Sequence, residues 1–486
     1  MSENKNPNFC GYFSFVLHSH LPWVLNHGVW PHGTNWVYEA AAETYIPIIR
    51  ECNKLVKEGY KPYLTIDLSP VLCEMLVDKK FVDGFIEYCE KKIEGAKTDL
   101  KQFEEMGYDA RQIQMAKFWI EFYQRTVDYF VTDLKKDIIR YGFKPLQDQG
   151  YFDIITCAAT HGYAPLLSKE SSIYAQFNVA SKSYERLFGK PPHGTWLAEC
   201  AYRPAYKWKK PLGNDNTEYD RPGVEVFLSK NRLKYFFIDT ALLLGGVSQG
   251  VYASRFPLLK ELWERFEAQY KPNEENFERT PLQPYLISTD AKNPVAIFTR
   301  DENTGILVWS GEHGYPGCSV YLDFHKKHYS DPFGGGSGLR YWKVTDAKAD
   351  LGSKQIYNIN DIKDVLDQNA GHYKEAIKGV LWQNQGKVVQ NGILIAMYDC
   401  ALFGRWWFEG PWFLERVVRF MAMDPEIELT NCRRYIEEFP PNKVVSITEG
   451  SWGQGSSHYI WLNKDTSWTW EKIYEIEEIV EDCHQI

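Results

Sequence analysis

Short runs of apolar residues recur along the chain and indicate buried β-strands. Their apolar side chains occupy successive positions rather than alternating, which is typical of strands covered on both faces. Segments with helical spacing separate most of the runs. The runs are Phe13–His18, Tyr63–Leu68, Phe152–Cys157, Thr195–Glu199, Tyr235–Asp239, either Val295–Phe298 or Ile306–Trp309, and Ile393–Tyr398. Because strands and helices alternate in this way, the pattern predicts a parallel β/α barrel of about seven strands.

Two further regions have helical spacing. Phe81, Phe85 and Cys89 begin a long helical pattern that reaches about residue 145, and it follows the second predicted strand. Past Gly410, the segments PWFLERVVRFMAM and TSWTWEKIYEIEEIVED also keep helical spacing. We therefore expect an α/β catalytic barrel over residues 1–403, with a helical insertion at about 79–145 and a lid-like loop at about 245–281. A C-terminal helical domain is expected over residues 404–486.

Composition narrows the class of protein. Of the 486 residues, 44% are hydrophobic and 24% are charged, which are values typical of a folded globular chain. The formal charge of -9 argues against nucleic acid as a partner. The chain has no apolar run of membrane-spanning length and no signal-peptide pattern at its start, so we expect a cytoplasmic protein without a membrane partner. Aromatic residues reach 15%, and some of their rings are therefore available to stack on a ligand.

Polar side chains follow nearly every predicted strand. In a parallel barrel these strand ends converge on one cavity, where the reactive groups of barrel enzymes lie. One polar strand end would be unremarkable, but six indicate a site. The residues concerned are His18 and His20, Asp67, His161, Glu199, Asp239 and Asp399.

Two carboxylates in this set suggest sugar chemistry. Glu199 and Asp399 directly follow apolar strands, and aromatic residues flank both. Cleavage of a glycosidic bond uses one carboxylate at the anomeric carbon and one protonated carboxyl at the leaving oxygen, while aromatic rings hold the sugar. The alternative is structural: Glu199 could pair with Arg203 or Arg416, and Asp399 could cap a turn.

The two histidines of the HSH segment allow three interpretations. Side chains two apart on a strand point the same way, so His18 and His20 can both face the cavity. With His161 and Asp239 they could bind a divalent metal, as in metal-dependent carbohydrate hydrolases. Neutral imidazoles could instead bond to sugar hydroxyls, or the histidines could simply be buried. We favour a site without metal.

A set of motifs resembles a known family. HSHLPW, ATHGYAPLL, GTWLAECAY, YFFIDT, VWSGEHGYPG, SGLRYW, YDCALFGRWWFEGP and GSWGQGSSHYIWLN occur in this order over nearly the whole chain. Together they resemble glycoside hydrolase family 57, and within it most the 1,4-α-glucan branching enzymes.

This resemblance implies a retaining mechanism on an incomplete (β/α)7 barrel without a cofactor. Glu199 would be the nucleophile and Asp399 the general acid/base. The partner would be an α-glucan such as amylose, glycogen or a maltooligosaccharide. The implied substrate-binding residues are His18, His20, His161 and Asp239, the loop residue Tyr252, and the stacking residues Trp30, Trp36, Trp309, Trp406, Trp407, Trp452 and Trp461. About half of the tryptophans are expected to serve the core instead.

The sequence also departs from the family. Ala401 and Arg405 stand where the family usually has Glu and His, and the chain ends at Ile486, earlier than we expect for a full branching enzyme. A fixed cation near Asp399 would favour its ionised form and weaken it as an acid. Hydrolysis of the amylase type and a catalytically weak glucan-binding barrel therefore remain alternatives to branching.

Overall fold

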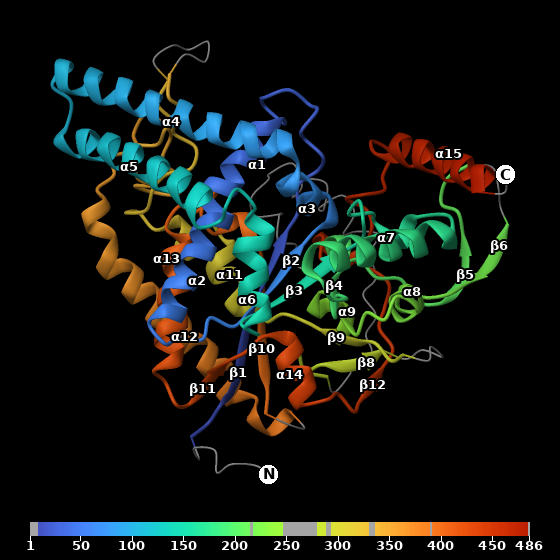
Figure 1. Cartoon of the computed structure of the whole chain (residues 1–486). Helices are drawn as coiled ribbons and strands as arrows, with labels where there is room; N and C mark the ends of the chain where they lie inside the picture. The colour runs from blue at the N-terminus through green and yellow to red at the C-terminus, as the bar shows by residue number, and fades with distance from the viewer. Residues whose placement is uncertain are drawn as a thin grey trace.

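A curved sheet lies at the centre of the molecule (Figure 1). The structure is a computed structural model that describes residues 8–213, 217–245, 279–287, 293–329, 336–388 and 391–484. Within these residues, seven parallel strands follow the order β10-β1-β2-β3-β4-β7-β9. They are β1 (Gly11–Ser19), β2 (Leu64–Leu68), β3 (Phe152–Cys157), β4 (Gly194–Trp196), β7 (Tyr235–Phe237), β9 (Ala296–Phe298) and β10 (Ile393–Asp399).

The sheet curls into an open barrel. The last parallel strand, β10, pairs with the first, β1, but no ladder joins β9 to β10 in the described part of the chain. One hydrogen bond crosses this seam, from the Asp301 backbone N–H to the Ile395 carbonyl at 3.4 Å. Strand β9 pairs instead with the antiparallel β8 (Tyr285–Ile287), which pairs with β12 (Val444–Val445). The predicted α/β fold, an incomplete (β/α)7 barrel, is confirmed.

The structure decides between the two candidates for the sixth strand. Val295–Phe298 contains β9, whereas Ile306–Trp309 lies in helix α11 (Glu302–Trp309). The side chain of Asp301 begins this helix by accepting a hydrogen bond from the Thr304 N–H at 2.7 Å. A run of four apolar residues cannot distinguish a buried strand from a buried helix, and the cap provides the missing information.

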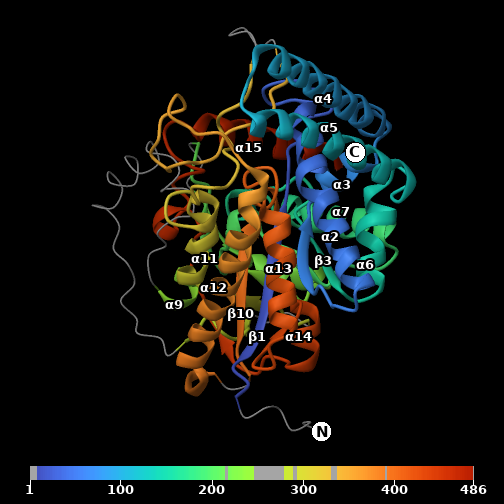
Figure 2. The same cartoon turned by 90° about the vertical axis from the view of Figure 1, so that its left-hand side faces the viewer.

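Helices cover the outer face of the sheet. In Figure 2, α11, α12, α13 and α2 lie side by side over β10 and β1. All nine residues of β1 are buried, which is why its pattern is continuously apolar. The helices around the barrel are α1 (Thr34–Ala40), α2 (Ile46–Lys57), α3 (Pro70–Val77), α6 (Lys144–Asp148), α7 (Glu170–Phe188), α8 (Val224–Lys230), α9 (Thr240–Leu244), α11, α12 (Ile362–Gln383) and α13 (Gly410–Ala422).

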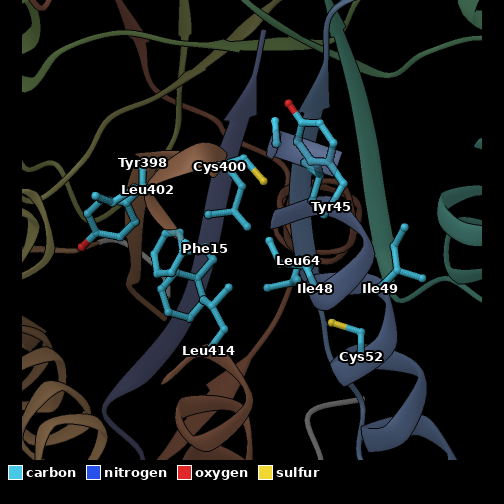
Figure 3. Packing of buried hydrophobic residues seen from close by; sticks show 14 of the residues in the cluster. Phe15, Tyr45, Ile48, Ile49, Cys52, Leu64, Tyr398, Cys400, Leu402 and Leu414 are labelled. Carbon is cyan, nitrogen blue, oxygen red and sulfur yellow. The ribbon is translucent and has the colours of Figure 1, made fainter. Parts of the chain in front are cut away.

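The core between sheet and helices consists of interlocking aliphatic and aromatic side chains. Figure 3 shows Phe15 of β1 beside Tyr398 of β10 and Leu414 of α13, with Ile48 and Cys52 projecting from α2. The first three are at most 5% exposed. This packing ties the first strand of the chain to elements almost 400 residues later.

The predicted insertion forms two long antiparallel helices, α4 (Lys79–Met106) and α5 (Ala110–Thr132). Their shared core includes Phe85 and Phe130, whose ring centroids lie 4.8 Å apart. Gly107 ends α4 in the left-handed conformation, with φ of 67°, which glycine adopts without steric cost. Both helices lie beyond the carboxyl ends of the strands, at the upper left of Figure 1.

The C-terminal segment is not helical throughout. It contains α13, α14 (Cys432–Glu438) and α15 (Ser467–His484), but it also adds β11 (Ile427–Leu429) beside β1 and β12 beside β8. A two-stranded ribbon, β5 (Tyr206–Lys209) with β6 (Glu218–Arg221), lies near α15 (Figure 1). Among the described residues, none of the helices combines the length and hydropathy that crossing a membrane requires.

Candidate active site

All seven polar residues predicted at strand ends lie near the carboxyl ends of their strands. His18 of β1 is in register with Asp67 of β2 on one side and with Asp399 of β10 on the other. Glu199 follows β4 in the short turn Ala198–Cys200. The charges of Asp399 and His18 both act on Glu199, so these residues share one electrostatic environment. The barrel therefore brings the predicted carboxylate pair and histidines together.

Glu199 is held in an unusual backbone conformation. Its φ of 59° and that of Cys200, 49°, lie in the left-handed region, which residues with a side chain rarely occupy. Trp452 holds the turn from outside, because its backbone N–H donates to the Glu199 carbonyl at 3.1 Å. The Trp452 indole N–H also donates to Oε2 of Glu199 at 2.8 Å. One residue thus fixes both the backbone and the carboxylate of Glu199.

The ionisation of Glu199 depends on opposing influences. Burial raises the pKa of its carboxyl, and the negative charge of Asp399 raises it further. The hydrogen bond from Trp452 and the charge of His18 oppose this shift, but the pKa remains above its ordinary value. Two nearby carboxyls that cannot easily ionise together are suited to distinct roles, one charged and one protonated.

The structural alternative for this pair is not supported. The Arg203 guanidinium donates to the carbonyls of Pro204 and Pro222, and Arg416 pairs with Asp367 at 2.6 Å. Asp399 precedes a short 3-10 turn, Cys400–Leu402, without making a side-chain cap to it.

The three histidines form a stacked cluster. His18 Nδ1 lies 2.5 Å from Oδ2 of Asp67, and His18 Nε2 lies 3.0 Å from Nε2 of His161. The His20 ring stacks on His161 with centroids 4.0 Å apart, and its Nδ1 lies 3.0 Å from the Ser69 hydroxyl. Both nitrogens of His18 are engaged within the protein, whereas His20 and His161 are partly exposed.

Of the three histidines, His18 is the one whose surroundings favour a positive charge. Burial disfavours the charged imidazole, but the hydrogen bond to Asp67 and the charges of Asp67, Asp399 and Glu199 outweigh it and raise the pKa of His18. Burial and the neighbouring His18 lower the pKa of His20 to about 3 and that of His161 well below its ordinary value. His20 and His161 are therefore neutral at pH 7 and can donate or accept hydrogen bonds with hydroxyls.

The expectation that the HSH segment binds no metal can be tested directly. Within the described ranges, no group of three or more His, Cys, Asp or Glu side chains is placed to hold a metal ion. Chelation is a direct test. We expect that dialysis against EDTA will leave both the turnover of glucan and the melting temperature unchanged, since no metal–ligand free energy contributes to either. Stoichiometric zinc or iron in the purified protein, with loss of activity on its removal, would contradict this expectation.

The predicted stacking tryptophans fall into two groups. Trp309, Trp407 and Trp452 are at most 5% exposed, so in this structure their rings are packed inside the protein, in line with the expectation that some of the tryptophans serve the core. Trp309 donates its indole N–H to the Met397 carbonyl at 3.0 Å, as a core residue does. The other four are at least partly exposed: Trp30, Trp36, Trp406 and Trp461.

Asp239, another predicted substrate-binding residue, makes its contacts inside the protein. Its side chain is fully buried, and its Oδ1 accepts from the Ala241 N–H at 3.0 Å to cap α9. Its Oδ2 pairs with Arg300 at 2.6 Å. Both oxygens are therefore engaged inside the protein, and contact of Asp239 with a substrate stays a prediction. Its partner Arg300 lies 5.8 Å from the Trp452 ring.

Arg405 does not lie next to Asp399 as an uncompensated cation. Its Nε donates to Glu39 at 2.9 Å, and its guanidinium lies 5.6 Å from the Trp36 ring and 5.3 Å from the Trp406 ring. A carboxylate therefore balances the charge that the sequence suggested could weaken Asp399.

The structure also reveals residues that the sequence did not single out for the site. Tyr163 donates or accepts at 2.7 Å with His458 Nδ1, and His458 Nε2 lies 2.8 Å from Glu449. The Tyr163 ring stacks on Trp461 at 4.9 Å. Tyr163 and His458 belong to the motifs ATHGYAPLL and GQGSSHYIW, but only their spatial proximity links them. Tyr252 and most of the expected lid lie outside the described residues.

A barrel open at one seam, with a carboxylate pair and histidines at its strand ends, defines the class of carbohydrate-active barrel enzymes that the motifs suggested. The sequence model of the family Glycosyl hydrolase family 57 matches residues 14–448 of this chain. The chain belongs to this family.

Individual relatives are similar over most of the chain. The 1,4-α-glucan branching enzyme of Thermococcus kodakarensis is 38% identical over 96% of this chain, which spans 64% of that relative's length. Its crystal structure, in complex with glucose and additives, superposes with a TM-score of 0.84 at 37% identity, covering 96% of this chain and 78% of that one. The Pyrococcus horikoshii branching enzyme gives 0.82 at 35% identity, with the same coverage. The α-amylase AmyC of Thermotoga maritima gives 0.73 at 26% identity, covering 93% and 79%.

Proposed function

We propose that this protein is a retaining 1,4-α-glucan branching enzyme. Glu199 attacks the anomeric carbon of an α-1,4 bond while Asp399 protonates the leaving oxygen, and the glycosyl group is held on Glu199. Asp399 then deprotonates a 6-hydroxyl of an acceptor chain, which attacks the glycosyl-enzyme and forms the branch.

The observation that carries this proposal is the pairing of the two carboxyls at the ends of β4 and β10. Glu199 is fixed by Trp452 at 2.8 Å, and the charges of Asp399 and Glu199 act on each other and on His18. The relatives support transfer over hydrolysis, since two of them are branching enzymes at 35 to 38% identity. Hydrolysis is the second candidate, because the Thermotoga amylase has the same fold at 26% identity.

The proposed substrate is an α-glucan. His20 and His161 are neutral and partly exposed, so they can hydrogen-bond to sugar hydroxyls. Trp30 is 79% exposed, and Trp36 and Trp406 flank Arg405, so these rings can receive the apolar faces of pyranose units. Residues 1–403 would form the catalytic barrel and residues 404–486 the segment that closes it.

Incubation with amylose tests the proposal. Branching predicts that enzymatic debranching of the product releases short chains, with little gain in reducing ends before debranching. A large gain in reducing ends without branches would identify a hydrolase. An unchanged polymer would favour the catalytically weak glucan-binding barrel.

A further inference from the structure

Asp67 is a buried carboxylate next to the site that the proposed mechanism does not use. It lies on β2, in register with His18, and its side chain is fully inaccessible to solvent. Its Oδ2 is 2.5 Å from His18 Nδ1, and its Oδ1 has no hydrogen-bond partner within the described structure. An ionised carboxylate in such a place is costly unless a charge pairs with it. His18 is the group placed to do so.

His18 is oriented by contacts on both ring nitrogens. The proton on Nδ1 points to Asp67, which leaves Nε2 facing Nε2 of His161 at 3.0 Å. Two unprotonated nitrogens at that distance would repel each other, so one must carry a proton. A neutral His161 could supply that proton as its Nε2–H tautomer, but the carboxyls of Asp67, Asp399 and Glu199 around His18 favour a second proton on His18. In that state His18 donates at both nitrogens and is an imidazolium.

The surroundings of His18 supply the opposite charges. Its ring stacks on the neutral Trp196 of β4 at 4.8 Å, which screens it from solvent. The titratable groups that face it from the neighbouring elements are Asp67 of β2, His161 after β3, Glu199 after β4, Asp399 of β10 and His20 of its own strand end.

We propose that Asp67 is a positioning residue that keeps His18 protonated, so that a fixed positive charge lies beside the Glu199–Asp399 pair. This inference rests on the proposed function. The His18 cation lets one carboxyl of the pair ionise despite burial and despite its negative neighbour. Without it, Glu199 would remain protonated to higher pH and could not act as a nucleophile. Asp67 does not touch the substrate and acts only through His18.

The test is the pH profile of the Asp67→Asn variant. Asparagine is nearly isosteric and can still accept from His18 Nδ1, so the ring stays in place while the charge is removed. We expect the acidic limb of kcat/KM on amylose to move to higher pH by about one unit, the size of a nearby-charge effect. Activity at pH 5 then falls about ten-fold more than activity at pH 8.

Asp153→Asn is the matched control. Asp153 is also a buried strand carboxylate, hydrogen-bonded to the Tyr235 hydroxyl and the Arg433 N–H, but it lies at the opposite end of β3. Its variant should keep the wild-type acidic limb. If Asp67→Asn lowers activity equally at every pH, or leaves the limb unmoved, Asp67 has only a packing role and the proposal is wrong.

A second measurement needs neither Asp67→Asn nor turnover of glucan. In protein labelled with ¹⁵N-histidine, the His18 resonances are assigned by their absence in His18→Gln. Nitrogen shifts of a doubly protonated ring at pH 7 and above support the proposal, and a neutral His18 at pH 7 overturns it. Because this readout is independent of turnover, an unchanged amylose polymer would reject the proposed function without deciding whether His18 is protonated, so the two failures can be distinguished.

Discussion

Glu199→Gln and Asp399→Asn should each lower glucan turnover by more than about 10³-fold, because each removes a group that the retaining mechanism cannot replace. Gln and Asn preserve the size and shape of the two side chains. The Trp452 indole N–H can still donate to an amide oxygen at position 199. The variants should therefore fold normally, and steady-state rates on amylose, with circular dichroism as a check, measure the effect.

The two variants should differ with an activated substrate. An α-glycosyl fluoride does not need a proton on its leaving group, so Asp399→Asn should still form the glycosyl-enzyme but release it slowly. Intact-mass spectrometry should then detect a sugar adduct on Glu199 in Asp399→Asn and none in Glu199→Gln. Glu312→Gln, on an exposed residue paired with Lys348, is the control and should behave as wild type. Adducts in both variants, or a loss below about ten-fold, would show that the assignment of roles is wrong.

Asp239→Asn should lower the free energy of unfolding by about 3–5 kcal/mol, the typical result of removing one partner of a buried ion pair. The side chains of Asp239 and Arg300 are 0% and 7% exposed, and they are 2.6 Å apart. Without the carboxylate, the buried Arg300 guanidinium loses the counter-charge to which it hydrogen-bonds, and Glu302 is the remaining acid whose charge acts on it. Chemical denaturation followed by fluorescence measures the change.

An exposed pair provides the comparison. Glu94 and Lys97 are 70% and 54% exposed and 2.6 Å apart, so Glu94→Gln should cost no more than about 1 kcal/mol. If Asp239→Asn lowered the free energy of unfolding only about as much as Glu94→Gln, solvent would have to reach Arg300 or another acid would have to replace Asp239.

The fold was predictable where burial leaves a clear pattern. β1 and β10 are covered on both faces, so their apolar runs predicted strands directly. Ile306–Trp309 is equally apolar but helical, and only the cap at Asp301 distinguishes it. The strands β11 and β12 in the C-terminal segment were missed because they are two or three residues long. Their formation depends on the neighbouring β1 and β8 rather than on local propensity.

The site was predictable in its residue types but not in all its roles. His18, Glu199 and Asp399 lie together because the carboxyl ends of the strands of a parallel barrel converge on one edge. Asp239 was predicted to bind substrate because it follows a predicted strand, as the other site residues do. The same position also suits a helix N-cap, and the FIDTALLL segment fits both interpretations. Trp407 and Trp452 could not be separated from exposed tryptophans, since an aromatic ring serves a core and a sugar equally well.

The pairing of distant segments has a consequence for how the protein is made. β1 pairs with β10 and β11, and Trp452 holds the Glu199 turn across 253 positions. During synthesis, β1 can pair with β2 early, but its pairing with β10 and β11 must wait until residues 393–429 leave the ribosome. The Glu199 turn lacks its Trp452 contacts until residue 452 has also emerged. An incomplete chain therefore exposes an apolar strand edge for most of its elongation time. The contacts that fix the backbone and carboxylate of Glu199 are therefore among the last to form.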